Sequence, residues 1–154
     1  MIRSRKRIWL CTVLLAVNLA FIWGNSLLPG EMSAAFSDWV KALLASLFPG
    51  DAPAHQGTGL LRKIAHFSEF CTLGMCLCWL FTMLGRKRGW PFFWGSLAAC
   101  IDETIQCFVP DRGPGILDVL IDTCGVAAGI GLLLFGHSFI KKFKNNNKTG
   151  GKRK

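Results

Sequence analysis

A long run of residues without any charged side chain lies near the start of the chain, at residues 8–30. A helix needs about 20 consecutive apolar residues to cross the hydrocarbon core of a bilayer. Three more apolar runs follow this one, in a chain of 154 residues that is 51% hydrophobic. The pattern predicts an all-α integral membrane protein with short loops. We expect four transmembrane helices, at about residues 8–28, 64–84, 90–109 and 116–140.

The net charge of +9 is concentrated in three basic clusters, at residues 3–7, 86–88 and 141–154. With four spans, all three clusters lie on one side of the membrane. Short loops rich in Lys and Arg remain in the cytoplasm, so we expect both termini there. This distribution argues against nucleic acid as a partner, and we expect the protein to contact membrane lipids instead. We expect a membrane domain at residues 1–145 and a basic, disordered cytoplasmic tail at residues 146–154.

The first outer loop contains a segment with helical periodicity, "SAAFSDWVKALLASLF", at residues 33–48. Phe36, Val40, Leu43 and Leu47 recur at helical spacing, and Asp38 falls off that stripe. This spacing predicts one amphipathic helix that lies on the outer surface of the membrane.

Acidic side chains interrupt three of the four predicted spans. A charged residue at the middle of a spanning helix costs about 2.5–3.5 kcal/mol. At a rise of about 1.5 Å per residue, Glu69, Asp102 and Asp122 all lie roughly 9–11 Å below the outer surface. Because three helices place an acid at one depth, we expect a polar pocket that opens to the outside. The other polar residues near this level are Lys63, His66, Glu103, Gln106, Arg112 and Asp118.

The last span carries its polar residues on one face. Asp118 and Asp122 are four residues apart, and Gly125 and Gly129 continue the same side of the helix. Small residues at this spacing let a neighbouring helix approach closely. We therefore expect this face to pack against another helix rather than against lipid.

The acids of this pocket outnumber its cations. Like charges in a low-dielectric site do not all remain ionised. Protonation of some carboxyls, a divalent metal ion or a cationic group on a ligand would each relieve the imbalance. The metal ligands on offer are His66, Glu69, Asp102 and Asp122, side chains of the types that bind divalent ions. No spacing among them is diagnostic, so the sequence does not identify a cofactor.

Three stretches that carry these residues resemble the motifs of the VanZ-like family, which is named for a teicoplanin-resistance protein. Residues 63–70, "KIAHFSEF", resemble its Lys-x-x-His-Phe-x-Glu-aromatic box. Residues 102–112, "DETIQCFVPDR", resemble its Asp-Glu-x-x-Gln-x-Phe-x-Pro-x-Arg box, and residues 118–125 resemble a third box. The resemblance covers nearly the whole chain apart from the basic tails. It implies a bacterial cell-envelope protein that confers or supports resistance to glycopeptides such as teicoplanin.

This sequence departs from the family pattern at three positions. Asp111 stands where a Gly often precedes the arginine, and Gly115 stands where a Ser is frequent. Asp122 occupies a position that many members fill with Asn, which makes the pocket of this chain more acidic.

The leading hypothesis is an outward-facing pocket that handles a lipid-linked or cell-wall-related ligand, or a glycopeptide itself. The ligand-binding residues would be Lys63, Gln106, Arg112, Asp118 and Asp122.

Two other functions stay open. One is an enzyme of the outer leaflet, a hydrolase or transferase with or without a metal, that acts on a lipid-linked precursor. Its catalytic residues would be His66, Glu69, Asp102 and Glu103, which can donate and accept protons, with Arg112 holding a phosphate. The other is a proton-coupled transporter, since buried acids also mark proton paths. No matching acids line the inner half of the spans, which disfavours transport.

Overall fold

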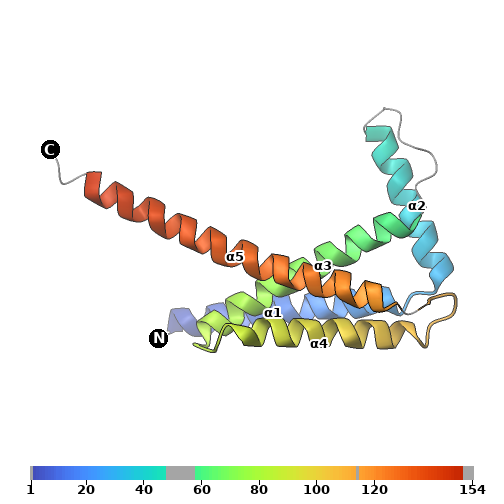
Figure 1. Ribbon diagram of the computed structural model, residues 1–154, viewed down its shortest axis with the longest axis horizontal. Helices are drawn as coiled ribbons and strands as arrows, with labels where there is room; N and C mark the ends of the chain where they lie inside the picture. The colour runs from blue at the N-terminus through green and yellow to red at the C-terminus, as the bar shows by residue number, and fades with distance from the viewer. Residues whose placement is uncertain (1, 48–57, 114, 151–154) are drawn as a thin grey trace.

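The computed structural model describes residues 2–47, 58–113 and 115–150, and these residues form helices without any strand. Figure 1 shows α1, α3, α4 and α5 side by side as a bundle, while α2 stands away from one end. The helices are α1 Ile2–Ser26, α2 Gly30–Leu47, α3 Thr58–Met83, α4 Gly89–Gln106 and α5 Ile116–Gly150. This arrangement confirms the prediction of an all-α protein.

The prediction of four spanning helices is not confirmed. In the described part of the chain, three helices are long and apolar enough to cross a membrane, at Arg5–Ser26, Gly59–Met83 and Ile116–Lys142. The helix that falls short is α4, which has 18 residues and carries three polar residues near its C-terminal end. These residues, Asp102, Glu103 and Gln106, are buried against the other helices rather than exposed on the outside of the bundle.

The two ends of the bundle differ in charge. The start of α1, the end of α5 and the α3–α4 connection lie at one end, and the α1–α2 and α4–α5 connections lie at the other (Figure 1). The basic residues 86–88 and the described lysines near the end of α5 therefore share an end with the start of α1. The described parts of the three basic clusters thus gather at one end of the molecule.

The closest packing in the bundle is between α3 and α5. A Cβ atom on Gly125 would lie 2.6 Å from the carbonyl oxygen of Phe67, and one on Gly129 would overlap the carbonyl group of Cys71. On the opposite helix, a Cβ on Gly74 would overlap the backbone of Val126. The close approach that the two glycines of α5 predict is present, because only hydrogen occupies the space between the two backbones.

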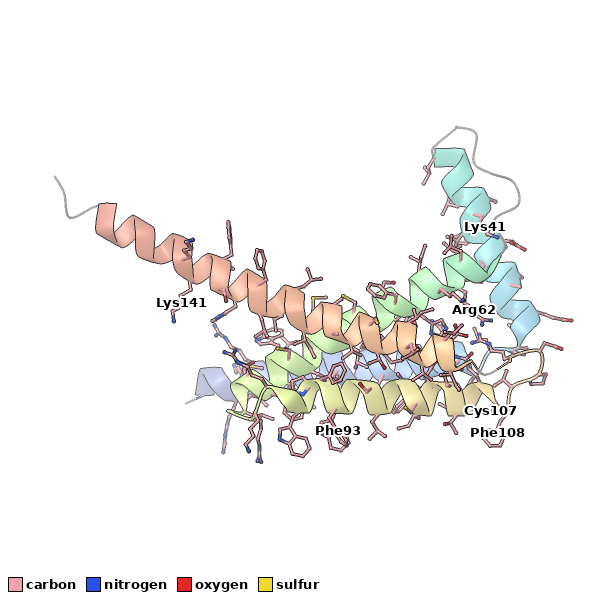
Figure 2. The ribbon with its side chains drawn as sticks, viewed as in Figure 1. Lys41, Arg62, Phe93, Cys107, Phe108 and Lys141 are labelled. Atoms are coloured by element: carbon pink, nitrogen blue, oxygen red, sulfur yellow. The ribbon has the colours of Figure 1, made fainter. Side chains whose placement is uncertain are left out.

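The core of the bundle is apolar, and it lies between the buried polar residues of α4 and the end of the bundle that carries the basic residues. Its fully buried members include Ile22 from α1, Phe70 and Leu73 from α3, Ala99 from α4 and Val126 from α5. The outer surface is also apolar, as large exposed side chains cover α1 and α4. Figure 2 shows Phe93 and Phe108 pointing away from the bundle. A continuous apolar exterior of this kind suits lipid rather than water.

The helix α3 ends at a glycine cap, whereas α5 continues into the segment that was expected to be disordered. Gly85 has a φ of 65°, and the amide of Arg86 donates to the carbonyl of Phe81 over 3.0 Å, which closes α3 as a glycine-terminated helix. In contrast, α5 continues to Gly150 and so includes the first residues of the segment expected as a disordered tail. Residues 151–154 lie outside the described residues.

The outer-loop segment forms α2, as its periodicity predicts. Ser37 is buried against the bundle, while Phe36, Trp39 and Leu43 are exposed. The apolar stripe therefore faces outward, and smaller residues make the contact with the rest of the protein. The location of this helix at a membrane surface stays a prediction.

Candidate functional site

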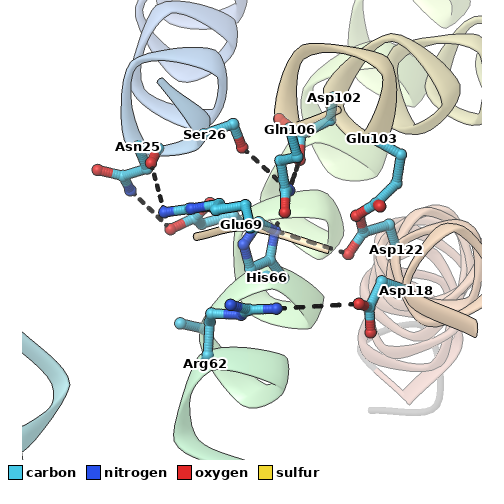
Figure 3. A network of polar contacts seen from close by, with 12 residues as sticks. Asn25, Ser26, Arg62, His66, Glu69, Asp102, Glu103, Gln106, Asp118 and Asp122 are labelled. Carbon is cyan, nitrogen blue, oxygen red and sulfur yellow. Dashed lines mark hydrogen bonds and ion pairs between the residues drawn. The ribbon is translucent and has the colours of Figure 1, made fainter. Parts of the chain in front are cut away.

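A cluster of polar residues lies where the ends of α1, α3, α4 and α5 meet, on the side of the bundle that carries α2 (Figure 3). Each helix contributes because its polar residues fall on the face turned to the others. A small pocket opens into this cluster. Its lining residues are Arg62, Lys63, His66, Glu103, Gln106, Asp118, Ile121 and Asp122.

His66 on α3 occupies the centre of the cluster. Its Nδ1 atom lies 3.8 Å from Oδ2 of Asp102 on α4 and 3.9 Å from Oδ1 of Asp122 on α5. The two carboxylates are 0% and 1% exposed. One imidazole nitrogen thus stands between two buried acids from different helices.

Asp102 is held in place by a hydrogen-bonded neighbour one turn along α4. The Nε2 atom of Gln106 donates to Oδ2 of Asp102 over 2.9 Å and to the hydroxyl of Ser26 on α1 over 3.3 Å. Ser26 and Gln106 are both buried. This link fixes the Asp102 carboxylate relative to α1 and leaves its Oδ1 without a hydrogen-bond partner.

Glu69 points toward α1 rather than into the pair of acids around His66. The Nδ2 atom of Asn25 donates to Oε1 of Glu69 over 3.0 Å. The carbonyl oxygen of Asn25 accepts a hydrogen bond of 2.9 Å from Nη2 of Arg112. Asn25 therefore connects a carboxylate of α3 with the cation of the α4–α5 loop.

Arg112 is buried, with 8% of its surface exposed, although it is a loop residue. Burial lowers the pKa of its guanidinium, as does the nearby charge of Arg62, while Asp102 and Glu103 oppose that shift. Its Nε and Nη1 atoms have no hydrogen-bond partner. A buried guanidinium with free donors beside acids is suited to receive the oxygen atoms of an anionic ligand.

Two further contacts join the helices at the edge of the pocket. The amide of Gly115 donates to Oε2 of Glu103 over 3.0 Å, which ties the start of α5 to α4. Arg62 and Asp118 form an ion pair with an Nη2 to Oδ2 distance of 3.9 Å. Lys63 lines the pocket but is exposed. All the site residues expected from the sequence thus lie in or beside this cluster.

Several buried acceptors in the cluster have no hydrogen-bond partner. These are Oε2 of Glu69, Oδ1 of Asp102 and both carboxylate oxygens of Asp122. A buried, unsatisfied polar group costs about 1–3 kcal/mol, and more when it is charged. The protein therefore keeps several buried acceptors, each with an unfavourable free energy, in one place. Such a group is characteristic of a site that receives a proton, a cation or a ligand.

The group that could hold a metal is smaller than the one expected from the sequence. Ligand atoms of His66, Asp102 and Asp122 lie within 4.8 Å of one another. Glu69, the fourth candidate, is not part of this group because its carboxylate turns to Asn25.

Sequence reasoning missed three residues of the site, Arg62, Asn25 and Ser26. Asn25 and Ser26 are neutral and lie at the end of the charge-free first run, so neither stands out by charge. Their signal was the polar pair in "GNSLLPG", next to the proline that follows α1.

Two departures from the family motifs have a structural explanation. Asp111 has a φ of 59°, a left-handed conformation that glycine adopts without strain, so a Gly is the natural residue there. Gly115 immediately precedes α5, and its carbonyl accepts from the amide of Asp118 over 2.9 Å. Ser is a preferred residue at such a helix start because its hydroxyl can cap it.

The sequence model of the VanZ/LLP1 family matches residues 8–137, which is most of the chain and includes every residue of the cluster. No curated protein and no solved structure gives a significant match.

Proposed function

Because the chain belongs to the VanZ-like family, we propose that it is a bacterial cell-envelope membrane protein that supports resistance to glycopeptides such as teicoplanin. Its polar cluster would act by handling the phosphate-bearing part of a lipid-linked cell-wall precursor. The proposal depends above all on Arg112, which is buried near the acids of the cluster and has no hydrogen-bond partner for its Nε and Nη1 atoms. The N–H donors of an arginine form charge-assisted hydrogen bonds with phosphate oxygens.

The remaining chemistry of the cluster fits the same ligand. The unpaired carboxylate oxygens of Glu69, Asp102 and Asp122 are acceptors for hydroxyl or amine groups, which a sugar-linked precursor carries. Lys63 and Arg62 at the rim supply positive charge at the entrance.

We also propose that the site faces outward and that both termini are cytoplasmic. The described parts of the three basic clusters share one end of the molecule, and the polar cluster lies toward the other. Lys and Arg in short connections favour the cytoplasmic side. Figure 1 shows α4 running along the bundle, so it carries the chain from the basic end to the end with the polar cluster.

The binding experiment uses purified protein in lipid-bilayer discs with a lipid-linked cell-wall precursor, followed by native mass spectrometry. Arg112→Ala should abolish the bound precursor, and Arg112→Lys should retain part of it, since Lys keeps the charge but not the paired donors. Arg86→Ala, at the opposite end, is the matched control. Equal binding by wild type and Arg112→Ala would contradict the proposal.

An outer-leaflet hydrolase or transferase is the second candidate, because two acids with unpaired oxygens, Asp102 and Asp122, flank His66, and Glu69 has an unpaired oxygen on the same helix as His66. A general acid or base needs a free proton-accepting atom, and Oε2 of Glu69 has no hydrogen-bond partner. If the site hydrolyses the precursor, wild type converts it to products of lower mass and Glu69→Gln binds it unchanged. Unaltered precursor with wild type rules out hydrolysis of that substrate.

A transport path is less well supported. The buried residues Phe70, Leu73, Ala99 and Val126 fill the bundle directly below the cluster. The described helices place no further acid between this apolar layer and the basic end.

A further inference from the structure

We infer that His66, Asp102 and Asp122 bind a single divalent metal ion, Mn²⁺ or Zn²⁺, whose remaining coordination positions open into the pocket. The ion would sit between α3, α4 and α5. The metal site rests on its own geometry, whereas its use in holding a phosphate rests on the proposed function.

The spacing of the donor atoms comes close to what one ion requires. Two ligands bound at about 2.1 Å lie about 3–4 Å apart. Nδ1 of His66 is 3.8 Å and 3.9 Å from the nearest oxygens of Asp102 and Asp122, and the three donors fall within 4.8 Å of one another. Side-chain adjustments of a few tenths of an ångström would bring them onto a common centre.

The burial of Asp122 is a separate observation that indicates a ligand. This side chain is 1% exposed, and neither of its oxygens has a hydrogen-bond partner. A carboxylate is not retained in such surroundings without compensation. Asp122 lines the pocket together with His66.

Charge balance favours a divalent ion. Two carboxylates and one neutral imidazole carry two negative charges, which a divalent ion cancels. A protonated His66 would cancel one of them and leave a buried negative charge. Arg112 lies near Asp102 as a further cation, but its one hydrogen bond goes to the backbone carbonyl of Asn25 and not to either carboxylate.

The surroundings of the three ligands resemble those of a bound metal. Gln106 orients Asp102 through a hydrogen bond of 2.9 Å, and such supporting contacts are usual around metal ligands. One imidazole with two carboxylates suits Mn²⁺ and Zn²⁺, because carboxylates favour the former and imidazole the latter. Three protein ligands leave positions for water or for a ligand oxygen, as in catalytic rather than structural sites.

The experiment measures binding of Mn²⁺ alone, without any lipid precursor, to metal-stripped full-length protein in bilayer discs. Free Mn²⁺ is counted by its electron paramagnetic resonance spectrum. Wild type should bind a single Mn²⁺ with saturation, and added Zn²⁺ should compete. Asp102→Asn and Asp122→Asn should weaken binding at least tenfold, and Asp38→Asn, an exposed acid on α2, should bind as wild type does.

A second measurement covers the case in which an acid variant does not fold. Pulsed spectroscopy of Mn²⁺ on wild type should show nitrogen coupling from one imidazole, which disappears in His66→Gln and persists in His137→Ala. Absence of saturable Mn²⁺ and Zn²⁺ binding by folded wild type would overturn the inference, as would equal binding by folded Asp122→Asn. If metal-free protein still binds the precursor, the proposed function holds. That result would contradict a role for the metal in holding the phosphate.

Discussion

Nδ1 of His66 stands 3.8 Å from a carboxylate oxygen of Asp102 and 3.9 Å from one of Asp122, so a single side chain of α3 faces an acid from α4 and an acid from α5. These three helices belong to separate parts of the sequence. The contact therefore joins the family motifs into one site, and it also makes the stability of the bundle depend on the charge state of that site.

Removal of His66 should destabilise the protein. His66→Phe keeps an aromatic ring of similar size but removes the polar group that faces both buried carboxylates, and Gln106 remains as a hydrogen-bond donor to Asp102 alone. A buried polar group that loses its partner costs about 1–3 kcal/mol, so we expect a loss of that order in the free energy of unfolding. Chemical denaturation in detergent micelles measures it, with His137→Phe near the basic end as control. A loss below about 1 kcal/mol would show that the acids do not depend on His66.

The contact between α3 and α5 should not tolerate a methyl group. Gly129→Ala would place a Cβ atom against the carbonyl of Cys71, and overpacking of this kind costs about 1–3 kcal/mol. Gly131→Ala is the matched control, because nothing lies within 4 Å of its Cβ position. Thermal unfolding followed by circular dichroism should show a lower Tm for the first variant only. Equal Tm values would mean that the two helices lie further apart than the structure has them.

The conformation of Asp111 makes a prediction of its own. With a φ of 59°, this residue lies in the left-handed region, which costs a residue with a Cβ about 1–2 kcal/mol. Asp111→Gly should equal or exceed the wild-type free energy of unfolding, and Asp111→Ala should lower it by up to about 1 kcal/mol. The same denaturation assay compares them. A stabilising Asp111→Ala would contradict a left-handed conformation at this position.

The topology can be measured by labelling introduced cysteines in intact cells, in a background without the native ones. Labels at residues 87 and 148 should be protected from an impermeant reagent, and labels at the exposed residues 31 and 113 should react. This outcome follows from the position of the basic clusters and from α4 carrying the chain along the bundle. A C-terminus that reacts from outside would mean three crossings, with the termini on opposite sides.

Much of the helical architecture could be predicted from the sequence because the apolar runs are long and the connections are marked by charge, proline or glycine. The shared depth of Asp102 and Asp122 was also visible, since helix rise is regular. The sequence did not show that the side chain of Glu69 turns to α1, because its partner Asn25 lies 44 residues away in a run that shows no charge.

The run at 90–109 predicts a span, but α4 does not reach the length and composition of a membrane span, for a physical reason. The run at 90–109 counts Trp90, Pro91 and Trp94 as apolar, but the same helix carries three polar residues near its end. Packing against α1, α3 and α5 buries these residues, and a sequence alone does not show that neighbours will provide such cover.

The central claim is that the polar cluster is the working site of the protein, and teicoplanin susceptibility of cells that produce the chain tests it most directly. Wild type should raise the inhibitory concentration of teicoplanin. Asp102→Asn and Arg112→Ala, present in the membrane at the wild-type level, should return it to that of cells without the protein, and Asp38→Asn should protect as wild type does. Full protection by folded Asp102→Asn and Arg112→Ala would contradict the claim and leave the cluster with a structural role only.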